Sequence, residues 1–595
     1  MPNCQGCGKE IAEGRVLCDE CADRQAKGKP PEQPSAVWTE RKKPSRSGLW
    51  VALAIVVAVA VAAWVWAQYG PQRSILGKQG QSLHAINLLP ENVPIALVLD
   101  VPRLRKEAPE GERLVKLLVD SAPQAWRPFA QSAANLKQAV GQMTLWMPTT
   151  FGPAAGTQPR TEEVSILETQ SPKAAQRMLK ELAQAIGQEK PKSETENRVR
   201  ILEWSKAKLA AARIDQFLVI GAARQKVSEI VKLALARGEG GLGKSALYAE
   251  ALKALEMQPM LTFVERPGEL MASMRRSMRG SGERVPPQMG MAEWAIVGVD
   301  LDPKGVFMRE AVKLDARGQQ MMKALAANPL KPAIAQWLPK DSTMAVAGGA
   351  FGPVMKMTLE MWQQGQPEFA SQIASVQQQL GLDFQRDLFD LLTGNWALVV
   401  GDLASVAQGQ APKMALIVES SPGGAPQVFD RLVATINKSA PGLAAVQAGQ
   451  KRALMNLGAG PGGAVQASLE ATPNVLAIGM PPAFVTALIQ GLPEAKSLAA
   501  FLKEKQAPQK TEMIVYFNPA SLTPVIGIAA ATAGAGEGAQ TAAKVIQGLG
   551  PMYGWSESPS KDRMYFEGRM AVDYKKLVAL AEETAKQASG GKRTR

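Results

Sequence analysis

The sequence predicts an α+β fold of two tandem, internally repeated lobes of mostly antiparallel sheet with packed helices, preceded by one membrane-spanning helix and a small cysteine-rich module. Three observations predict this order: cysteines confined to the N-terminus, one uncharged apolar run, and motifs that recur about 250 residues later. The 595-residue chain is 46% apolar and 21% charged. This composition is typical of a globular protein and excludes a polytopic membrane protein or a wholly disordered chain.

The cysteine-rich module covers residues 1–25. Cys4, Cys7, Cys18 and Cys21 form two C-x2-C pairs, and the rest of the chain contains no cysteine. Two such pairs can offer four thiolates to one tetrahedral ion, so the spacing predicts a zinc ribbon with one structural Zn2+ and no open position for catalysis. Two disulfides are the alternative, and they would require an oxidising compartment.

The apolar run lies within residues 48–68 and contains no charged residue from Leu49 to Ala67. As an α-helix this stretch rises about 28 Å, enough to cross a hydrocarbon core. Basic residues crowd its N-terminal side, so the positive-inside rule predicts an uncleaved signal anchor in the inner (plasma) membrane with a cytoplasmic N-terminus. A cleaved signal peptide is the alternative, but its apolar core is usually only ~7–15 residues long.

Two polar segments flank these elements. Residues 26–47 combine prolines with basic and acidic side chains and predict a flexible linker between ribbon and membrane. Residues 586–595 predict a disordered basic tail.

The part after the membrane span contains an internal repeat that predicts lobes at residues 80–325 and 330–585. The matched elements keep one order, and their offset drifts from 249 to 258 residues, as loop insertions would cause. The matches include Leu89-Pro90 with Leu338-Pro339, Val164–Leu167 with Ala415–Val418, Leu182 with Leu432, and Leu218–Gly221 with Leu476–Gly479. Short apolar strands alternate with amphipathic helices, such as one from Ser171 to Gly187, which predicts antiparallel sheets with helices on one face.

One glycine-rich motif resembles a nucleotide site but lacks the context for it. Gly238 to Ser245 fits the phosphate-loop pattern G-x4-G-K-[ST]. That chemistry needs a strand before the loop and a helix after it, whereas a predicted helix precedes this one. We therefore expect a loop between helices with Ser245 as N-cap, and no bound nucleotide.

Three other candidates also favour structural roles. Gly458 to Gly463 fits G-x-G-x-x-G, but an alternating strand pattern follows and predicts a hairpin loop. His84 is the only histidine, so most histidine-based metal and acid–base chemistry is excluded, and we expect it at a surface or interface. Asp383, Asp387 and Asp390 lack the calcium-loop pattern, so Asp383 is expected to cap a helix whose polar face carries the other two.

A family resemblance rests on three segments: Leu338-Pro339-Lys340-Asp341, Gly381 to Leu388, and Leu392-Thr393-Gly394. At these segments the sequence resembles the exported bacterial family DUF3352, a domain of unknown function. The likeness covers most of residues 80–580 and is clearest in the second lobe. It implies a location in the envelope and supplies no activity, cofactor or catalytic residue.

Together these patterns predict a single-pass envelope protein that binds or scaffolds rather than catalyses, with no catalytic or cofactor-binding residue besides the zinc ligands. The formal charge of +14 is scattered and aromatics are only 5%, so nucleic acid is not the expected partner. We expect a protein or polymer partner in the envelope and a cytoplasmic protein partner for the ribbon. Two alternatives stay open: an envelope hydrolase with two carboxylates ~5–10 Å apart in one cleft, and a transmembrane regulator whose ribbon contacts nucleic acid.

Overall fold

The computed structural model describes residues 83–100, 139–146, 164–186, 189–270, 291–302, 305–365, 367–403, 410–460, 463–508, 511–526 and 546–577, with single positions 103, 272 and 579. The predicted zinc ligands Cys4, Cys7, Cys18 and Cys21, the linker, the apolar run at 48–68 and the basic tail lie outside these residues. Within them, every helix is too short or too polar to cross a membrane.

The described strands form two series of ten, which we call the first and second halves. The first half contains β1 Ile95–Asp100, β2 Ala139–Trp146, β3 Val164–Thr169, β4 Lys192–Glu196, β5 Val199–Trp204, β6 Leu209–Ile214, β7 Phe217–Gly221, β8 Leu261–Glu265, β9 Ala292–Asp302 and β10 Gly305–Leu314. The second contains β11 Met344–Gly348, β12 Trp396–Val400, β13 Met414–Glu419, β14 Ala444–Val446, β15 Arg452–Gly460, β16 Gly463–Ala471, β17 Val475–Met480, β18 Met513–Phe517, β19 Leu549–Ser560 and β20 Arg563–Val572.

Helices connect these strands. Those of the first half are η1 Ala85–Leu88, α6 Pro172–Ile186, α7 Arg224–Leu235, η2 Leu242–Lys244 and α8 Ala246–Leu255. Those that follow are α10 Ala316–Ala327, η3 Pro332–Trp337, α11 Phe351–Gly365, α12 Pro367–Leu380, the π-helix η4 Phe384–Phe389, α14 Gly424–Ser439, α15 Pro482–Ile489, η5 Glu494–Lys496, α16 Leu498–Glu504 and η6 Pro519–Leu522. The predicted α+β class with mostly antiparallel sheet is confirmed.

All the strands pair antiparallel, and the order of the second half repeats that of the first. The first half runs β4-β5-β6-β7-β3-β2-β1-β8-β9-β10. The second runs β14-β15-β16-β17-β13-β12-β11-β18-β19-β20. Registers repeat as well: Val164 lies opposite Gly221, and their sequence counterparts Ala415 and Gly479 lie opposite each other.

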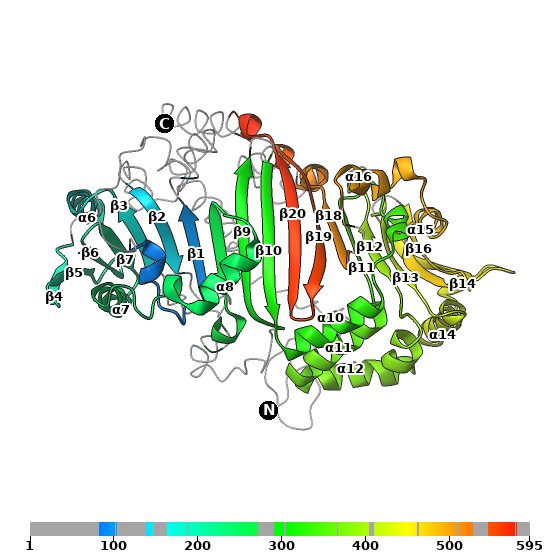
Figure 1. Ribbon diagram of the computed structural model, residues 1–595. Coiled ribbons are helices and arrows are strands. Elements are labelled where there is room, and N and C mark those ends of the chain that lie inside the picture. The colour runs from blue at the N-terminus through cyan, green and yellow to red at the C-terminus, as the bar shows by residue number, and fades with distance from the viewer. Residues whose placement is uncertain are drawn as a thin grey trace, which may run out of the picture. The chain divides into compact units, whose positions relative to one another are not determined.

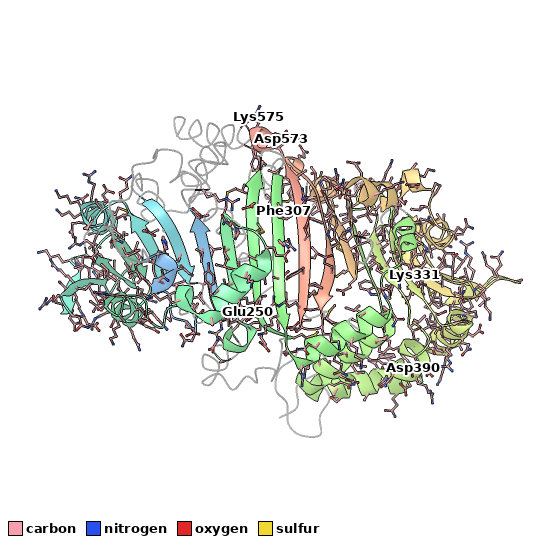
Figure 2. The ribbon with its side chains drawn as sticks, in the orientation of Figure 1. Glu250, Phe307, Lys331, Asp390, Asp573 and Lys575 are labelled. Atoms are coloured by element: carbon pink, nitrogen blue, oxygen red, sulfur yellow. The ribbon has the colours of Figure 1, made fainter. Side chains whose placement is uncertain are left out.

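The two halves meet where β10 pairs with its own counterpart, β20. The ladder runs from Gly305 opposite Ala571 to Lys313 opposite Arg563. Figure 1 shows β9, β10, β20 and β19 side by side. Glu250 of α8, labelled in Figure 2, lies within 3.4 Å of Lys313 and 3.0 Å of Arg563, so one carboxylate bridges two cations that face each other across this boundary. Continuous main-chain hydrogen bonds therefore join the halves.

Helices cover both faces of the sheet, so the expectation of helices on one face is wrong. All five residues of β7 are buried. Phe217 and Val219 share a core with Ile230 of α7, while the alternate residues Leu218 and Ile220 point to the face where α6 packs. Figure 1 shows α6 and α7 on either side of these strands. An interior strand covered on both faces needs a continuous apolar run, and β7 has one.

Candidate functional site

Two clefts lie in the first half of the described chain. The larger, of about 540 Å³, lies between α7 and the segments around Glu91 and Arg266. Its cations are partnered: Lys232 lies 3.6 Å from Glu196, and Arg266 lies 3.9 Å from Glu269. The lining also carries three carboxylates, Glu91, Glu229 and Glu269, so this cleft has no excess of positive charge.

The second cleft, of about 360 Å³, has a different chemistry, and we call it the basic groove. Its lining consists of Pro172, Lys173, Gln176, Arg177, Lys180 and Arg213. The lining contains no carboxylate and no aromatic ring. All four cations are exposed, and none forms an ion pair with any described residue. The basic groove thus presents four uncompensated positive charges from two elements of the fold.

The local sequence explains how these side chains come together. Lys173, Arg177 and Lys180 recur at i, i+4 and i+7 along α6, which puts them on one face of the helix. The opposite face, which includes Met178 and Leu182, is buried against the sheet. Arg213 extends from β6, and its Nη1 donates a hydrogen bond of 3.4 Å to the carbonyl of Pro172, which positions it beside the start of the helix.

Helix stability does not account for these charges. The first turn of α6 contains Lys173 and no acidic residue, whereas the helix dipole favours negative charge there. Lys173 and Arg177 are like charges four residues apart, and Arg177 and Lys180 are like charges three apart, which is unfavourable by about 0.2–0.5 kcal/mol per pair. Glu181, four residues after Arg177, is the one acidic side chain at a favourable spacing from these cations on α6, and no ion pair joins it to Arg177. Helix stability therefore does not explain the cations of the basic groove.

The second half of the chain provides an internal comparison. At the offset of 250 that relates α6 to α14, the counterparts of Lys173, Arg177 and Lys180 are Gly423, Gln427 and Asp430. Arg213 lies opposite Leu218, and the residue opposite the corresponding Leu476 is Ala471. None of these four counterparts is a cation. The same fold is thus built without the charges, so they belong to the first half specifically.

Two half-buried carboxylates lie elsewhere, in the centre of the sheet. Burial raises the pKa of Glu265, and burial together with the charge of Glu265 raises the pKa of Glu310. Neither residue lines the larger cleft or the basic groove.

The larger cleft, however, is lined by three carboxylates, Glu91, Glu229 and Glu269, so a cleft with more than one carboxylate, as the hydrolase alternative requires, is present. Two of the three are held in ion pairs, Glu229 with Lys226 at 3.4 Å and Glu269 with Arg266 at 3.9 Å. The described residues contain no group of three or more potential metal ligands.

The phosphate-loop motif is a packing site, and its expected structural role is confirmed. Helix α7 precedes it, and the hydroxyl of Ser245 accepts a hydrogen bond of 3.1 Å from the N–H of Tyr248 at the start of α8. The glycines are needed because η1 lies against them: a Cβ on Gly241 would be 1.9 Å from the carbonyl oxygen of Asn87. Lys244 pairs with Glu239 at 2.6 Å.

Gly458 to Gly463 and His84 also behave as expected. The glycine-rich segment joins β15 to β16 as a hairpin, with Gly460 opposite Gly463. The side chain of His84 is 46% exposed, and its Nδ1 lies 3.6 Å from Glu168. The hydrogen bond with Glu168 raises the pKa of His84 above its ordinary value.

The three aspartates divide into different roles. Asp383 caps η4 as expected, accepting hydrogen bonds from the N–H groups of Gln385 and Arg386. Asp390 is exposed and paired with Lys356. The expectation that Asp387 also lies on a polar face is wrong, because this residue is only 5% exposed.

The buried carboxylate of Asp387 is the centre of an ionic cluster with two exposed arginines, Arg386 and Arg431. One of its carboxylate oxygens lies 2.5 Å from Arg431 of α14, and the other accepts a 2.9 Å hydrogen bond from the N–H of Asp383. Burial opposes its ionisation, but the Asp383 hydrogen bond and the contacts with Arg386 and Arg431 together hold its pKa below the ordinary value. The cluster fixes η4 to α14.

The described part of the chain is thus an α+β protein of antiparallel ladders that carries a cation-lined groove on one of its two halves. A model of the family described as "Protein of unknown function (DUF3352)" matches residues 133–449, more than half of the chain. The chain belongs to this family.

Other comparisons add little. No curated protein matches the chain. The solved structure of TP0453 in crystal form I covers 42% of this chain and 87% of its own, at 9% identity and a TM-score of 0.24. A similarity of this size carries no argument about fold or function.

Proposed function

We propose that this protein is a non-enzymatic binding module of the cell envelope and that the basic groove is its binding surface. One observation carries the proposal: four exposed cations line one groove without an ion-pair partner among the described residues, although the counterpart positions of the second half do without them. Charges that helix stability does not explain and that the fold does not need are best accounted for by a partner.

The remaining architecture of the proposal comes from the sequence. The apolar run at 48–68 anchors the protein in the inner membrane, with the N-terminus in the cytoplasm. Two tandem repeated lobes, 80–325 and 330–585, lie outside the cytoplasm. The charge asymmetry around the span and the absence of cysteine after Cys21 support this topology.

The N-terminal zinc ribbon gives a prediction of its own. Residues Cys4, Cys7, Cys18 and Cys21 are expected to hold one zinc ion per chain, and Cys18→Ser is expected to release it, because three thiolates leave the tetrahedral site incomplete. Elemental analysis of the purified full chain measures the number of zinc ions per chain. A chain without zinc, whose cysteines react with a membrane-impermeant thiol reagent in intact cells, would contradict both the ribbon and the topology.

A photo-crosslinking amino acid tests the binding role of the basic groove. We expect a crosslinker at position 177 to give adducts in native membranes that are absent when the same crosslinker replaces Gln427, the counterpart of Arg177 in the second half. The adducts at position 177 are also expected to fall at least fivefold when Lys173, Lys180 and Arg213 are changed to glutamine. Equal labelling at 177 and 427 would refute the assignment of function to this groove.

A further inference from the structure

We propose that the basic groove binds an extended polyanion, a linear polymer that carries a phosphate group on each repeat. This inference rests on the proposed function and names the class of ligand. It is carried by the line of the charges, by the concave shape of the surface and by the residue types in the lining.

The charges form a line rather than a cluster. At a rise of about 1.5 Å per residue, Lys173, Arg177 and Lys180 are spaced by about 6 and 4.5 Å along α6, a row about 10 Å long. Arg213 flanks the start of this row through its contact with Pro172. A compact anion would meet only one or two of these side chains at a time, whereas a chain of anions laid along the helix meets all of them.

The absence of large apolar side chains distinguishes the site from a membrane-docking surface. The four cations line a shallow, open groove of about 360 Å³, along which a single polymer strand can lie. Proteins that dock on lipid also insert large apolar side chains among the cations, and the lining here has none: its uncharged members are Pro172 and Gln176. The basic groove therefore fits one chain.

The residue types define which part of the polymer is recognised. The lining contains no aromatic ring on which nucleic-acid bases could stack. Binding therefore depends on the charges of the polymer backbone alone. Two of the four cations are arginines, whose planar guanidinium groups bind phosphate with two parallel hydrogen bonds. The groove thus recognises the phosphate groups of the ligand and not its sequence.

Long-chain inorganic polyphosphate is a suitable probe for the purified full chain in detergent. The groove variant carries Lys173→Gln, Arg177→Gln, Lys180→Gln and Arg213→Gln. Its control removes the same number of charges from exposed lysines outside the groove, as Lys323→Gln, Lys496→Gln, Lys503→Gln and Lys561→Gln.

We expect the groove variant to lose at least fivefold in polyphosphate affinity at 0.1 M salt, and the control to stay within twofold of the parent chain. The slope of the logarithm of the affinity against the logarithm of the salt concentration is expected to become shallower by about 2–3 in the groove variant. Each lost phosphate contact removes about 0.7 from this slope for a flexible strand. The groove variant is also expected to unfold at the parent temperature or slightly above it, since like-charge repulsion on α6 is relieved.

Three results would overturn the proposal. The groove variant and its control could lose the same affinity, which would show that binding depends on the net charge of the protein and not on the groove. Vesicles containing anionic phospholipid could bind through the groove while polyphosphate does not, which would assign the site to a membrane. A crosslinker at position 177 could capture a protein while polyphosphate shows no groove-dependent binding, in which case the polyanion assignment fails and the proposed binding function stands.

Discussion

Gly241→Ala is expected to destabilise the folded region by about 3 kcal/mol, because the new Cβ would lie 1.9 Å from the carbonyl oxygen and 2.8 Å from the carbonyl carbon of Asn87. Both neighbours are main-chain atoms of η1, so no side-chain rotation relieves the overlap. Denaturant unfolding followed by tryptophan fluorescence measures the change.

Gly268→Ala is the matched control, since no atom lies within 4 Å of the Cβ it would add. We expect its stability to remain within about 0.5 kcal/mol of the parent chain. If Gly241→Ala behaved like this control, the packing of η1 against the glycine-rich segment would be wrong, and the motif would again be open to a phosphate-binding role. Stabilisation of the parent chain against denaturant by a nucleoside triphosphate would also indicate a phosphate-binding role for the motif.

Asp387→Asn is expected to lower the free energy of unfolding by about 2 kcal/mol at pH 7, the typical size of losing charge-assisted hydrogen bonds. The amide can still accept from the N–H of Asp383, but it cannot neutralise Arg431 or Arg386. The comparison is Asp390→Asn in the same segment. Asp390 is 48% exposed, and its ion pair with Lys356 is expected to contribute less than about 1 kcal/mol.

The effect of Asp387→Asn also has a defined pH dependence. The folded-state pKa of Asp387 lies below its ordinary value, so its ionised form stabilises the fold above the unfolded-state pKa of about 3.9. This stabilisation is lost as the pH falls through the folded-state pKa. The difference between parent and variant should therefore be constant between pH 6 and 8 and narrow below about pH 4. A difference that stayed unchanged on acidification would show that the charge of Asp387 is not what stabilises the cluster.

Local patterns predicted much of the fold. The strand from Val164 to Leu167, its counterpart and the helix from Ser171 are found within one or two residues of their expected places. The strands and their register follow from alternation and from repeated motifs, which are properties of short stretches of sequence. The continuous apolar run of β7 also contained the signal for a strand covered on both faces, although the sequence alone does not distinguish such a strand from a buried helix segment.

Features that join distant segments could not be predicted. The burial of Asp387 depends on Arg431, which lies on another helix. The basic groove combines α6 with Arg213 of β6, and only its helical part leaves a sequence signal, the i, i+4, i+7 spacing of Lys173, Arg177 and Lys180. Comparing these positions with their counterparts in the second half would have singled them out.

The pairing of β10 with β20 has a consequence for how such a molecule arose. In a homodimer joined edge to edge, each strand at the contact pairs antiparallel with its own copy about a two-fold axis. Here two counterpart strands pair in that way, and Arg309 opposite Glu567 is the middle pair of their ladder. The architecture is that of a two-fold dimer fused into one polypeptide. Fusion allowed the two copies to diverge, so one helix carries cations at positions 173, 177 and 180 while the corresponding positions of the second half are Gly423, Gln427 and Asp430.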